Sequence, residues 1–168
     1  IALHAAIAAP GALLKNSGTI LGTLAGLQND GVLDQVQNNG LIWSTGTGVT
    51  VAGILNTGSG SITSLVNNAS GSIAGDLAGL FNAGNITLID NFGMISSNSP
   101  NFGTVAGIWN NGGTISNLNN VGTLQASTTH GSLVGFGVVT ENGLIGTLDN
   151  SGIIAGQVGV LAQGNGQI

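Results

Sequence analysis

Apolar residues recur along this chain in short runs that alternate with polar residues, and Asn-x-Gly segments separate the runs. Alternation with a period of two is typical of β-strands, whereas a helix would need apolar spacings of three and four over about ten residues. Ile and Val are common at the apolar positions, as they are in strands generally. The pattern therefore predicts many short strands joined by tight corners.

One phrase recurs six times, first as AGLQN, AGILN, AGLFN and AGIWN and then in the looser forms FGVVT and VGVLA. Its glycines are Gly26, Gly53, Gly79, Gly107, Gly137 and Gly159. Their separation of roughly 22–30 residues is in the range of solenoid repeats. Because one copy alone cannot bury its apolar side, the copies are expected to stack.

Stacking of the copies would place like apolar residues in columns on three sides. The first side carries Leu27, Ile54, Leu80, Ile108, Val138 and Val160. The second side carries Leu33, Ile62, Ile86, Ile115, Ile145 and Ile168, and three residues later Val36, Leu65, Ile89, Leu118 and Leu148. The third side carries Ile20, Ile42, Ile73, Ile95, Leu124 and Ile154. Burial of each Ile contributes about 1.5–3 kcal/mol, so several turns together can offset the chain entropy.

Asparagines recur at two corners of each repeat. One corner has Asn29, Asn56, Asn82 and Asn110, and the other has Asn16, Asn38, Asn67, Asn91, Asn120 and Asn150. Asn tolerates left-handed backbone and Gly supplies positive φ without a steric penalty, so we expect left-handed corners. Stacked Asn amides are also expected to form hydrogen-bonded ladders.

These features predict an all-β fold, a right-handed parallel β-helix, as a three-sided β-solenoid with roughly 22–30 residues per coil. Residues 14–168 are expected to form the single solenoid domain, and residues 1–13 an N-terminal cap or flanking segment, helical or extended. The chain begins without Met and stops within a repeat, which indicates a fragment of a longer protein. The third side varies in length, so its loops are candidates for partner recognition.

Charge and composition narrow the possible partners. Charged residues make up 4% of the chain, the net charge is −5, and Lys15 is the single cation. Nucleic-acid binding and docking on an anionic bilayer both need clustered cations, so we expect neither. No apolar run approaches the length of a membrane span, about 18 residues, so no membrane insertion is expected of this segment. The absence of cysteine excludes disulfides and thiolate metal sites.

The ionisable residues do not form a catalytic pattern. The acids are Asp30, Asp34, Asp76, Asp90, Glu141 and Asp149. A polysaccharide-acting enzyme on this scaffold would gather two or more acids on one face, whereas Asp90 and Asp149 share a repeat position two turns apart. We therefore expect solvated strand and corner acids. His4, in the presumed cap, and His130, in a variable loop, lack a recognisable partner. The sequence predicts no catalytic residue, no cofactor and no metal site.

One position could form a contact surface. The residue after the first column should point outward, and it is Leu55, Phe81, Trp109, Val139 and Leu161 in successive copies after Gln28. An exposed apolar stripe of this kind usually marks an interaction site. The alternative is that third-side loops or flanking parts of a longer protein cover the stripe, with Trp43 belonging to the same cover.

The Asn-x-Gly-x-Ile phrase occurs twice per turn, as in IWNNGGTISNLNNVGTL and VVTENGLIGTLDNSGII. Over residues 14–168 it resembles the passenger domains of bacterial autotransporters and related haemagglutinin-type adhesins. The resemblance implies a secreted protein or one displayed on the bacterial outer-membrane surface, exported unfolded through an outer-membrane barrel. The very low charge departs from many such passengers.

The first functional hypothesis is a structural and adhesive stalk without catalytic activity. Its loops or a distal region would make multivalent weak contacts with a host or matrix protein or glycan. One alternative is a self-assembling extracellular filament whose open ends stack on like chains end to end. Another is a polysaccharide-acting enzyme on a pectin-lyase-like β-helix. Ice binding ranks last, because the Thr residues do not form a regular ladder.

Overall fold

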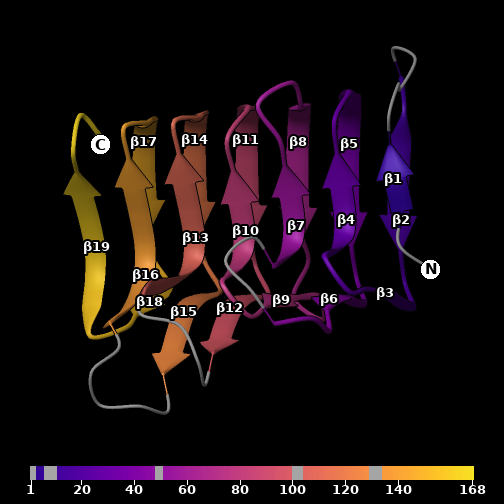
Figure 1. The fold of residues 1–168 in the computed structure, drawn as a ribbon. Helices are drawn as coiled ribbons and strands as arrows, with labels where there is room; N and C mark the ends of the chain where they lie inside the picture. Colours follow the sequence, from indigo (N-terminus) through magenta and orange to yellow (C-terminus); the bar gives the residue numbers. More distant parts are fainter. Residues whose placement is uncertain (1–2, 6–10, 48–50, 100–103, 129–133) are drawn as a thin grey trace.

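The computed structural model describes residues 3–5, 11–47, 51–99, 104–128 and 134–168. Throughout this described part the regular elements are β-strands, and the strands pair in parallel into three sheets. Figure 1 shows the coils side by side, with the N-terminus at one end of the stack and the C-terminus at the other. The predicted all-β, three-sided parallel β-helix is confirmed.

Each coil contributes one strand to each sheet, in cyclic order. Sheet A consists of β1 (Leu3–Ala5), β4 (Ala25–Asn29), β7 (Ala52–Asn56), β10 (Ala78–Asn82), β13 (Thr104–Asn111), β16 (Val134–Glu141) and β19 (Val158–Gln163). Sheet B consists of β2 (Leu13–Asn16), β5 (Val32–Asn38), β8 (Ser61–Asn67), β11 (Asn85–Asn91), β14 (Thr114–Asn120) and β17 (Leu144–Asn150). Sheet C consists of β3 (Thr19–Gly22), β6 (Leu41–Ser44), β9 (Ser72–Gly75), β12 (Met94–Ser99), β15 (Thr123–Thr128) and β18 (Ile153–Ala155).

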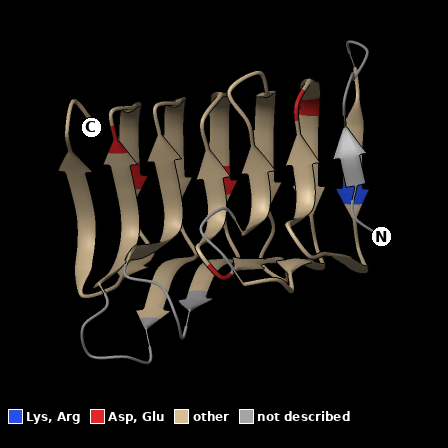
Figure 2. Cartoon of the chain, in the orientation of Figure 1, with Lys and Arg blue, Asp and Glu red and all other residues tan. Residues whose placement is uncertain are grey.

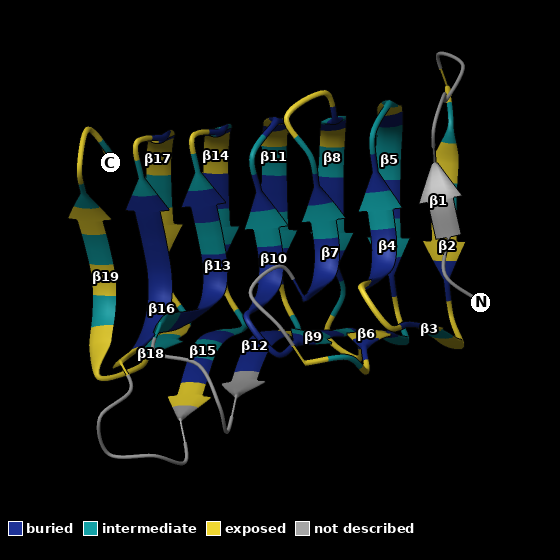
Figure 3. Cartoon of the chain, in the orientation of Figure 1, coloured by how far each residue is buried: buried dark blue, intermediate teal, exposed yellow. Residues whose placement is uncertain are grey.

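The strand register places like residues on like residues. In sheet A, Leu80 pairs with Ile54 on one side and Ile108 on the other. In sheet B, Ile115 lies between Ile86 and Ile145. The four predicted columns are therefore real, and their central members form one buried cluster between the three sheets. Figure 3 shows this buried interior along the described coils.

Residues 3–5, in the segment before residue 14, contribute to the stack as a strand. The short strand β1 pairs with β4 in register, with Leu3 opposite Leu27 and Ala5 opposite Asn29. Residues 3–5 thus occupy the sheet A position of the first coil. Among the described residues no helix is long and apolar enough to cross a membrane.

The prediction of left-handed backbone at the corners is wrong for most coils. Among the described residues, Asn142 is the one non-glycine residue with positive φ, at 53°, and Gly112 is a corner glycine with positive φ, at 73°. Crowding is the reason for glycine at several other corners. A Cβ there would lie less than 3.0 Å from the backbone oxygen of the glycine one coil earlier, as it would at Gly40, Gly93, Gly122 and Gly152.

The glycine of the repeated phrase has the same kind of cause, which the sequence did not reveal. A Cβ at Gly79 would lie 2.6 Å from Ile95 Cγ2 and 2.7 Å from the backbone nitrogen of Ser96. A Cβ at Gly26 would lie 2.8 Å from Ile42 Cγ2. Sheet A therefore approaches sheet C so closely that a methyl group does not fit, and the repeat must carry glycine there.

Candidate functional site

The three corners of the coil differ in how much length variation they contain. Segments from sheet A to sheet B are seven residues long in the first coil (6–12), four residues long once (57–60) and two residues long elsewhere. Segments from sheet B to sheet C are two residues long except for one of four residues (68–71). Segments from sheet C to sheet A comprise 23–24, 45–51, 76–77, 100–103, 129–133 and 156–157. We call this third corner the loop edge. Variation on the third side, predicted from the sequence, is thus confirmed by the strand bounds.

The other two corners are fixed from inside by asparagine ladders. At the corner between sheets A and B, Asn29 Nδ2 donates to Asn56 Oδ1 at 2.8 Å, and the same bond joins Asn56 to Asn82 and Asn82 to Asn110 at 2.7 Å. Asn110 Nδ2 then donates to Thr140 Oγ1 at 3.2 Å. The sequence analysis missed Thr140, although Thr140 stands at the Asn position of the looser FGVVT copy.

The second ladder runs along the corner between sheets B and C. Its bonds join Asn16, Asn38, Asn67, Asn91, Asn120 and Asn150 in order, with Nδ2 to Oδ1 distances of 2.7–2.9 Å. Each amide also binds its own corner. Asn91 Nδ2, for example, donates to the carbonyls of Gly93 at 3.3 Å and Thr123 at 3.2 Å. Both ladders, predicted from the Asn spacing, are therefore confirmed, and their amides are occupied by structural bonds.

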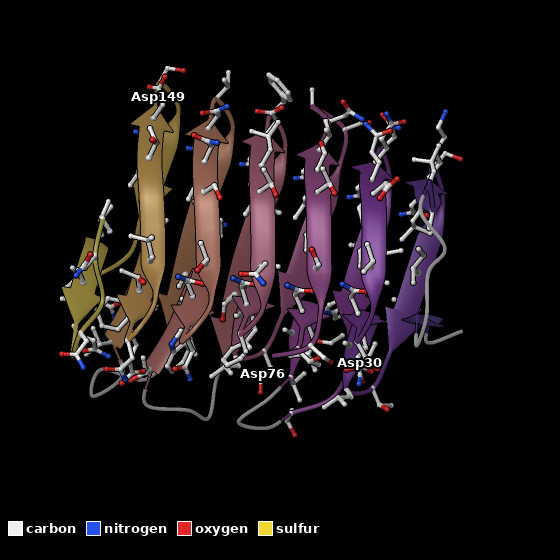
Figure 4. All side chains as sticks on the ribbon, turned by 90° about the horizontal axis from the view of Figure 1, so that it is seen from above. Asp30, Asp76 and Asp149 are labelled. Carbon is white, nitrogen blue, oxygen red and sulfur yellow. The ribbon has the colours of Figure 1, made fainter. Side chains whose placement is uncertain are left out.

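The carboxylates do not converge. Figure 4 shows Asp30, Asp76 and Asp149 well separated on the stack, and Figure 2 shows the acidic positions scattered over different coils. Asp30 accepts hydrogen bonds from Gln28 Nε2 at 2.9 Å and Thr57 Oγ1 at 2.7 Å. Asp90 accepts from Asn119 Nδ2 at 2.9 Å. The bonds from Thr57 and Asn119 tie adjacent coils together, which is a structural task.

Among the remaining acids, Glu141 ends β16, where it pairs with Asn111 and Gln163 on the neighbouring strands. The backbone N–H of Gly11 donates to the Asp34 carboxylate. His4 lies in β1, where its backbone pairs with Gln28, and His130 lies outside the described residues. Among the described residues no three His, Cys, Asp or Glu side chains lie close enough to hold a metal ion.

The predicted apolar stripe lies on the outer face of sheet A, but it is not uniformly exposed. The prediction is wrong for Val139, which is fully buried. The other members, Leu55, Phe81, Trp109 and Leu161, are half-buried. The rings of Phe81 and Trp109 lie 6.0 Å apart at 50°. Whether these residues bind a partner stays a prediction.

Small apolar clusters on the same face account for this burial. Phe81 and Trp109 pack against Ala52, Leu77 and Ala78 in one cluster. Trp109 and Leu161 pack against a second cluster of Ala106, Phe136 and Val139. The alanine that precedes glycine in the repeated phrase could have predicted these clusters, but no role was assigned to it from the sequence.

A groove at the loop edge combines an aromatic ring with recessed polar groups. It has a volume of about 390 Å³, and Trp43, Ser44, Ala74, Gly75, Asp76 and Ser96 contribute to its lining. Trp43 is 43% exposed, whereas Asp76 is only 7% exposed, so the expectation of a solvated corner acid is wrong for Asp76. The Ser44 hydroxyl is buried and has no hydrogen-bond partner.

The register explains why these residues meet. Ala74 of β9 pairs with Trp43 of β6 and with Ser96 of β12, so the three side chains occupy one row across three coils. Ser97 Oγ donates to the backbone oxygen of Asp76 at 2.5 Å, which fixes the corner beside the row. From the sequence, Trp43 was expected to help to cover the apolar stripe of sheet A, and the groove was not predicted.

Comparison of the chain with protein-family models, with curated proteins and with solved structures gives no match. The fold of the chain is therefore classified from its strand order and its asparagine ladders alone. The chain is a three-sided parallel β-helix with internal asparagine ladders.

Proposed function

We propose that the chain is a structural and adhesive segment of a secreted or surface-displayed β-solenoid protein, without catalytic activity of its own. The observation that carries the proposal is that, after the first coil, most of the longer connections lie at the loop edge (45–51, 100–103 and 129–133), while the other two corners each contain one connection longer than two residues. A scaffold that varies along one edge can alter its recognition loops without disturbing its core. The resemblance to autotransporter passengers and haemagglutinin-type adhesins points the same way.

The stack is built as a rigid support. Seven strands in sheet A, spaced by ~4.8 Å, give an axial length of ~29 Å for six steps. Apolar columns and two buried amide ladders connect every central coil to both neighbours. A coil can therefore not tilt without breaking bonds in both ladders, which suits a stalk that holds loops at fixed spacing.

Loops spaced along one edge suit many weak contacts better than one strong contact. Linking such contacts on one rigid body raises the overall affinity through effective concentration. With a net charge of −5 and a single cation, the partner is expected to be a protein or glycan of the host or matrix rather than nucleic acid. The location that fits this role is the bacterial outer-membrane surface or the extracellular space.

A loop-trimmed variant tests the proposal. Residues 129–133 would be replaced by Gly-Gln, the two residues (156–157) that make the equivalent connection in the last coil. We expect the variant to melt like the parent protein but to lose most of its adhesion when displayed on microspheres against matrix proteins and glycans. Ser59→Ala, at the corner between sheets A and B, is the matched control and should adhere normally.

Other outcomes would support the other hypotheses. Adhesion that is unchanged after trimming, or absent from the parent protein, contradicts the adhesive role. Head-to-tail particles in electron microscopy would favour a filament subunit. New reducing or unsaturated ends after incubation with acidic polysaccharides would favour an enzyme.

A further inference from the structure

The groove at the loop edge originates in a difference of coil length. Two residues (76–77) connect β9 to β10, whereas seven (45–51) connect β6 to β7 in the coil before and four (100–103) connect β12 to β13 in the coil after. A short corner between two longer ones leaves a notch in the stack. Asp76 lies in this short corner and contributes to the lining of the groove.

Three features of the notch point to a ligand. Trp43 presents a large flat apolar surface at its rim, with 43% of the residue exposed. Ala74, which pairs with Trp43 and Ser96 on the neighbouring strands, contributes only a methyl group to the lining between these two larger side chains. Ser44 is 2% exposed, and its hydroxyl has no hydrogen-bond partner. A buried hydroxyl without a hydrogen-bond partner is unfavourable, and a polar ligand group that reaches it offsets that cost.

We propose that this groove is a binding subsite for an uncharged saccharide. An exposed indole beside recessed oxygen groups matches a sugar ring, which has apolar faces and a periphery of hydroxyls. The Asp76 carboxylate offers acceptors for sugar hydroxyls, and such charge-assisted bonds are stronger than neutral ones. The volume of about 390 Å³ lies at the lower end of the range for small-molecule sites.

Charge selects among saccharides. Asp76 is the acid in the lining, and Lys15, the single cation of the chain, lies in β2 of sheet B, away from the groove. A uronic or sialic acid would bring a second negative charge close to Asp76 without a compensating cation. Because like charges at short distance repel each other, acidic sugars are expected to bind about tenfold more weakly, which corresponds to about 1.4 kcal/mol.

The inference deepens the proposed adhesive function by naming a ligand class, and nuclear magnetic resonance tests it directly. The chain has two tryptophans, so a nitrogen-15 correlation spectrum contains two indole signals. Titration with neutral gluco-, galacto- and manno-oligosaccharides should shift the Trp43 signal in a saturable way with at least one of them, and leave the Trp109 signal in place. The matching uronic-acid oligomer should need about tenfold higher concentration.

Variants separate a binding role from a structural one. Trp43→Ala should abolish saturable binding, and Ser44→Ala should weaken it about threefold to tenfold without lowering the melting temperature. Asp76→Asn should reduce the preference against the acidic oligomer. Trp109→Phe is the matched control, because Trp109 lies on sheet A, and it should bind normally.

Three results would overturn the inference. These are the absence of a Trp43 shift with every neutral oligosaccharide at millimolar concentration, equal shifts of both indoles, and normal binding by a folded Trp43→Ala variant. Trimming of 129–133 changes none of the described residues that line the groove, so the two proposals fail separately. If trimming abolishes adhesion but no saccharide binds, only the proposed saccharide subsite is refuted. If a saccharide binds but adhesion does not depend on the loop, only the proposed adhesive function is refuted.

Discussion

Removal of a single amide donor from the ladder provides the sharpest test of what holds the coils together. Asn91 is fully buried; it accepts from Asn67 Nδ2 at 2.8 Å and donates to Asn120 Oδ1 at 2.7 Å. Its Nδ2 also donates to the carbonyls of Gly93 and Thr123. Asn91→Asp keeps the shape and the acceptor, but it removes the donor that serves all three of these oxygens.

The expected loss of unfolding free energy follows from two estimates. The amide has two N–H groups for these three oxygens, so two lost donors at about 0.5–1.5 kcal/mol each give roughly 1–3 kcal/mol. A carboxylate facing the Asn120 oxygen is worse still, but the side chain can escape by taking up a proton. Protonation costs about 1.4 kcal/mol for each pH unit above the ordinary Asp pKa, or roughly 4 kcal/mol at neutral pH. We therefore expect about 3–5 kcal/mol.

The destabilisation caused by Asn91→Asp should depend on pH. Burial raises the pKa of the introduced carboxyl in the folded state, so the penalty is largest at neutral pH and shrinks as the pH falls toward the ordinary Asp value. Once this carboxyl is protonated, its O–H can donate to Asn120 Oδ1 and so replace one of the lost N–H bonds. Urea unfolding followed by circular dichroism at pH 7 and pH 4, each relative to the parent protein, measures the difference.

Asn150→Asp is the matched control. Asn150 accepts from Asn120 Nδ2 at 2.7 Å but donates only to the Gly152 carbonyl, at 3.3 Å and in an exposed position. A carboxylate there keeps the acceptor and loses one weak bond, so the change should stay within about 1 kcal/mol. Equal effects of the two substitutions, or a loss below about 1.5 kcal/mol for Asn91→Asp, would refute the ladder as a stabilising element.

Three further substitutions test the packing. Gly79→Ala should destabilise the fold by about 1–3 kcal/mol through overpacking. At Gly159 the nearest atom to an added Cβ is 3.6 Å away, so Gly159→Ala should change the stability by less than about 1 kcal/mol. Thermal melting of both variants measures the difference. Ile115→Asp places a charge in a fully buried column and should cost at least about 4 kcal/mol in urea unfolding, so a loss under about 1 kcal/mol would contradict the strand phase. Thr140→Val removes the acceptor for Asn110 and should cost about 0.5–1.5 kcal/mol, with no change meaning that the ladder ends one coil earlier.

The sequence was sufficient for the fold because its strongest signals are local and periodic. Like residues at equal spacing, such as Ile54 and Leu80, pair across adjacent coils as predicted. The amide ladders followed from the same spacing, since identical side chains at a corner can meet only one coil apart. Periodicity thus predicted both the columns and the corners.

The missed features depend on distances between sheets, which no spacing in the sequence encodes. The crowding at Gly79 needs the approach of sheet C to sheet A, and the burial of Val139 needs the small clusters outside sheet A. The groove at Trp43 arises because a short corner lies between two long ones, so it becomes visible only when coils of different length are stacked. For such features the sequence identifies the residues but does not show that they are in contact.

Both asparagine ladders have a direction. In every link between two asparagines the amide nitrogen of the earlier coil donates to the amide oxygen of the later coil, and bonds from the same nitrogen to nearby backbone carbonyls fix this orientation. The stack is consequently polar along its axis, with oxygen leading at one end and nitrogen at the other. Any further coil, whether from this chain or another molecule, can prolong the ladders only with the same polarity, because the reverse orientation would set nitrogen against nitrogen or oxygen against oxygen.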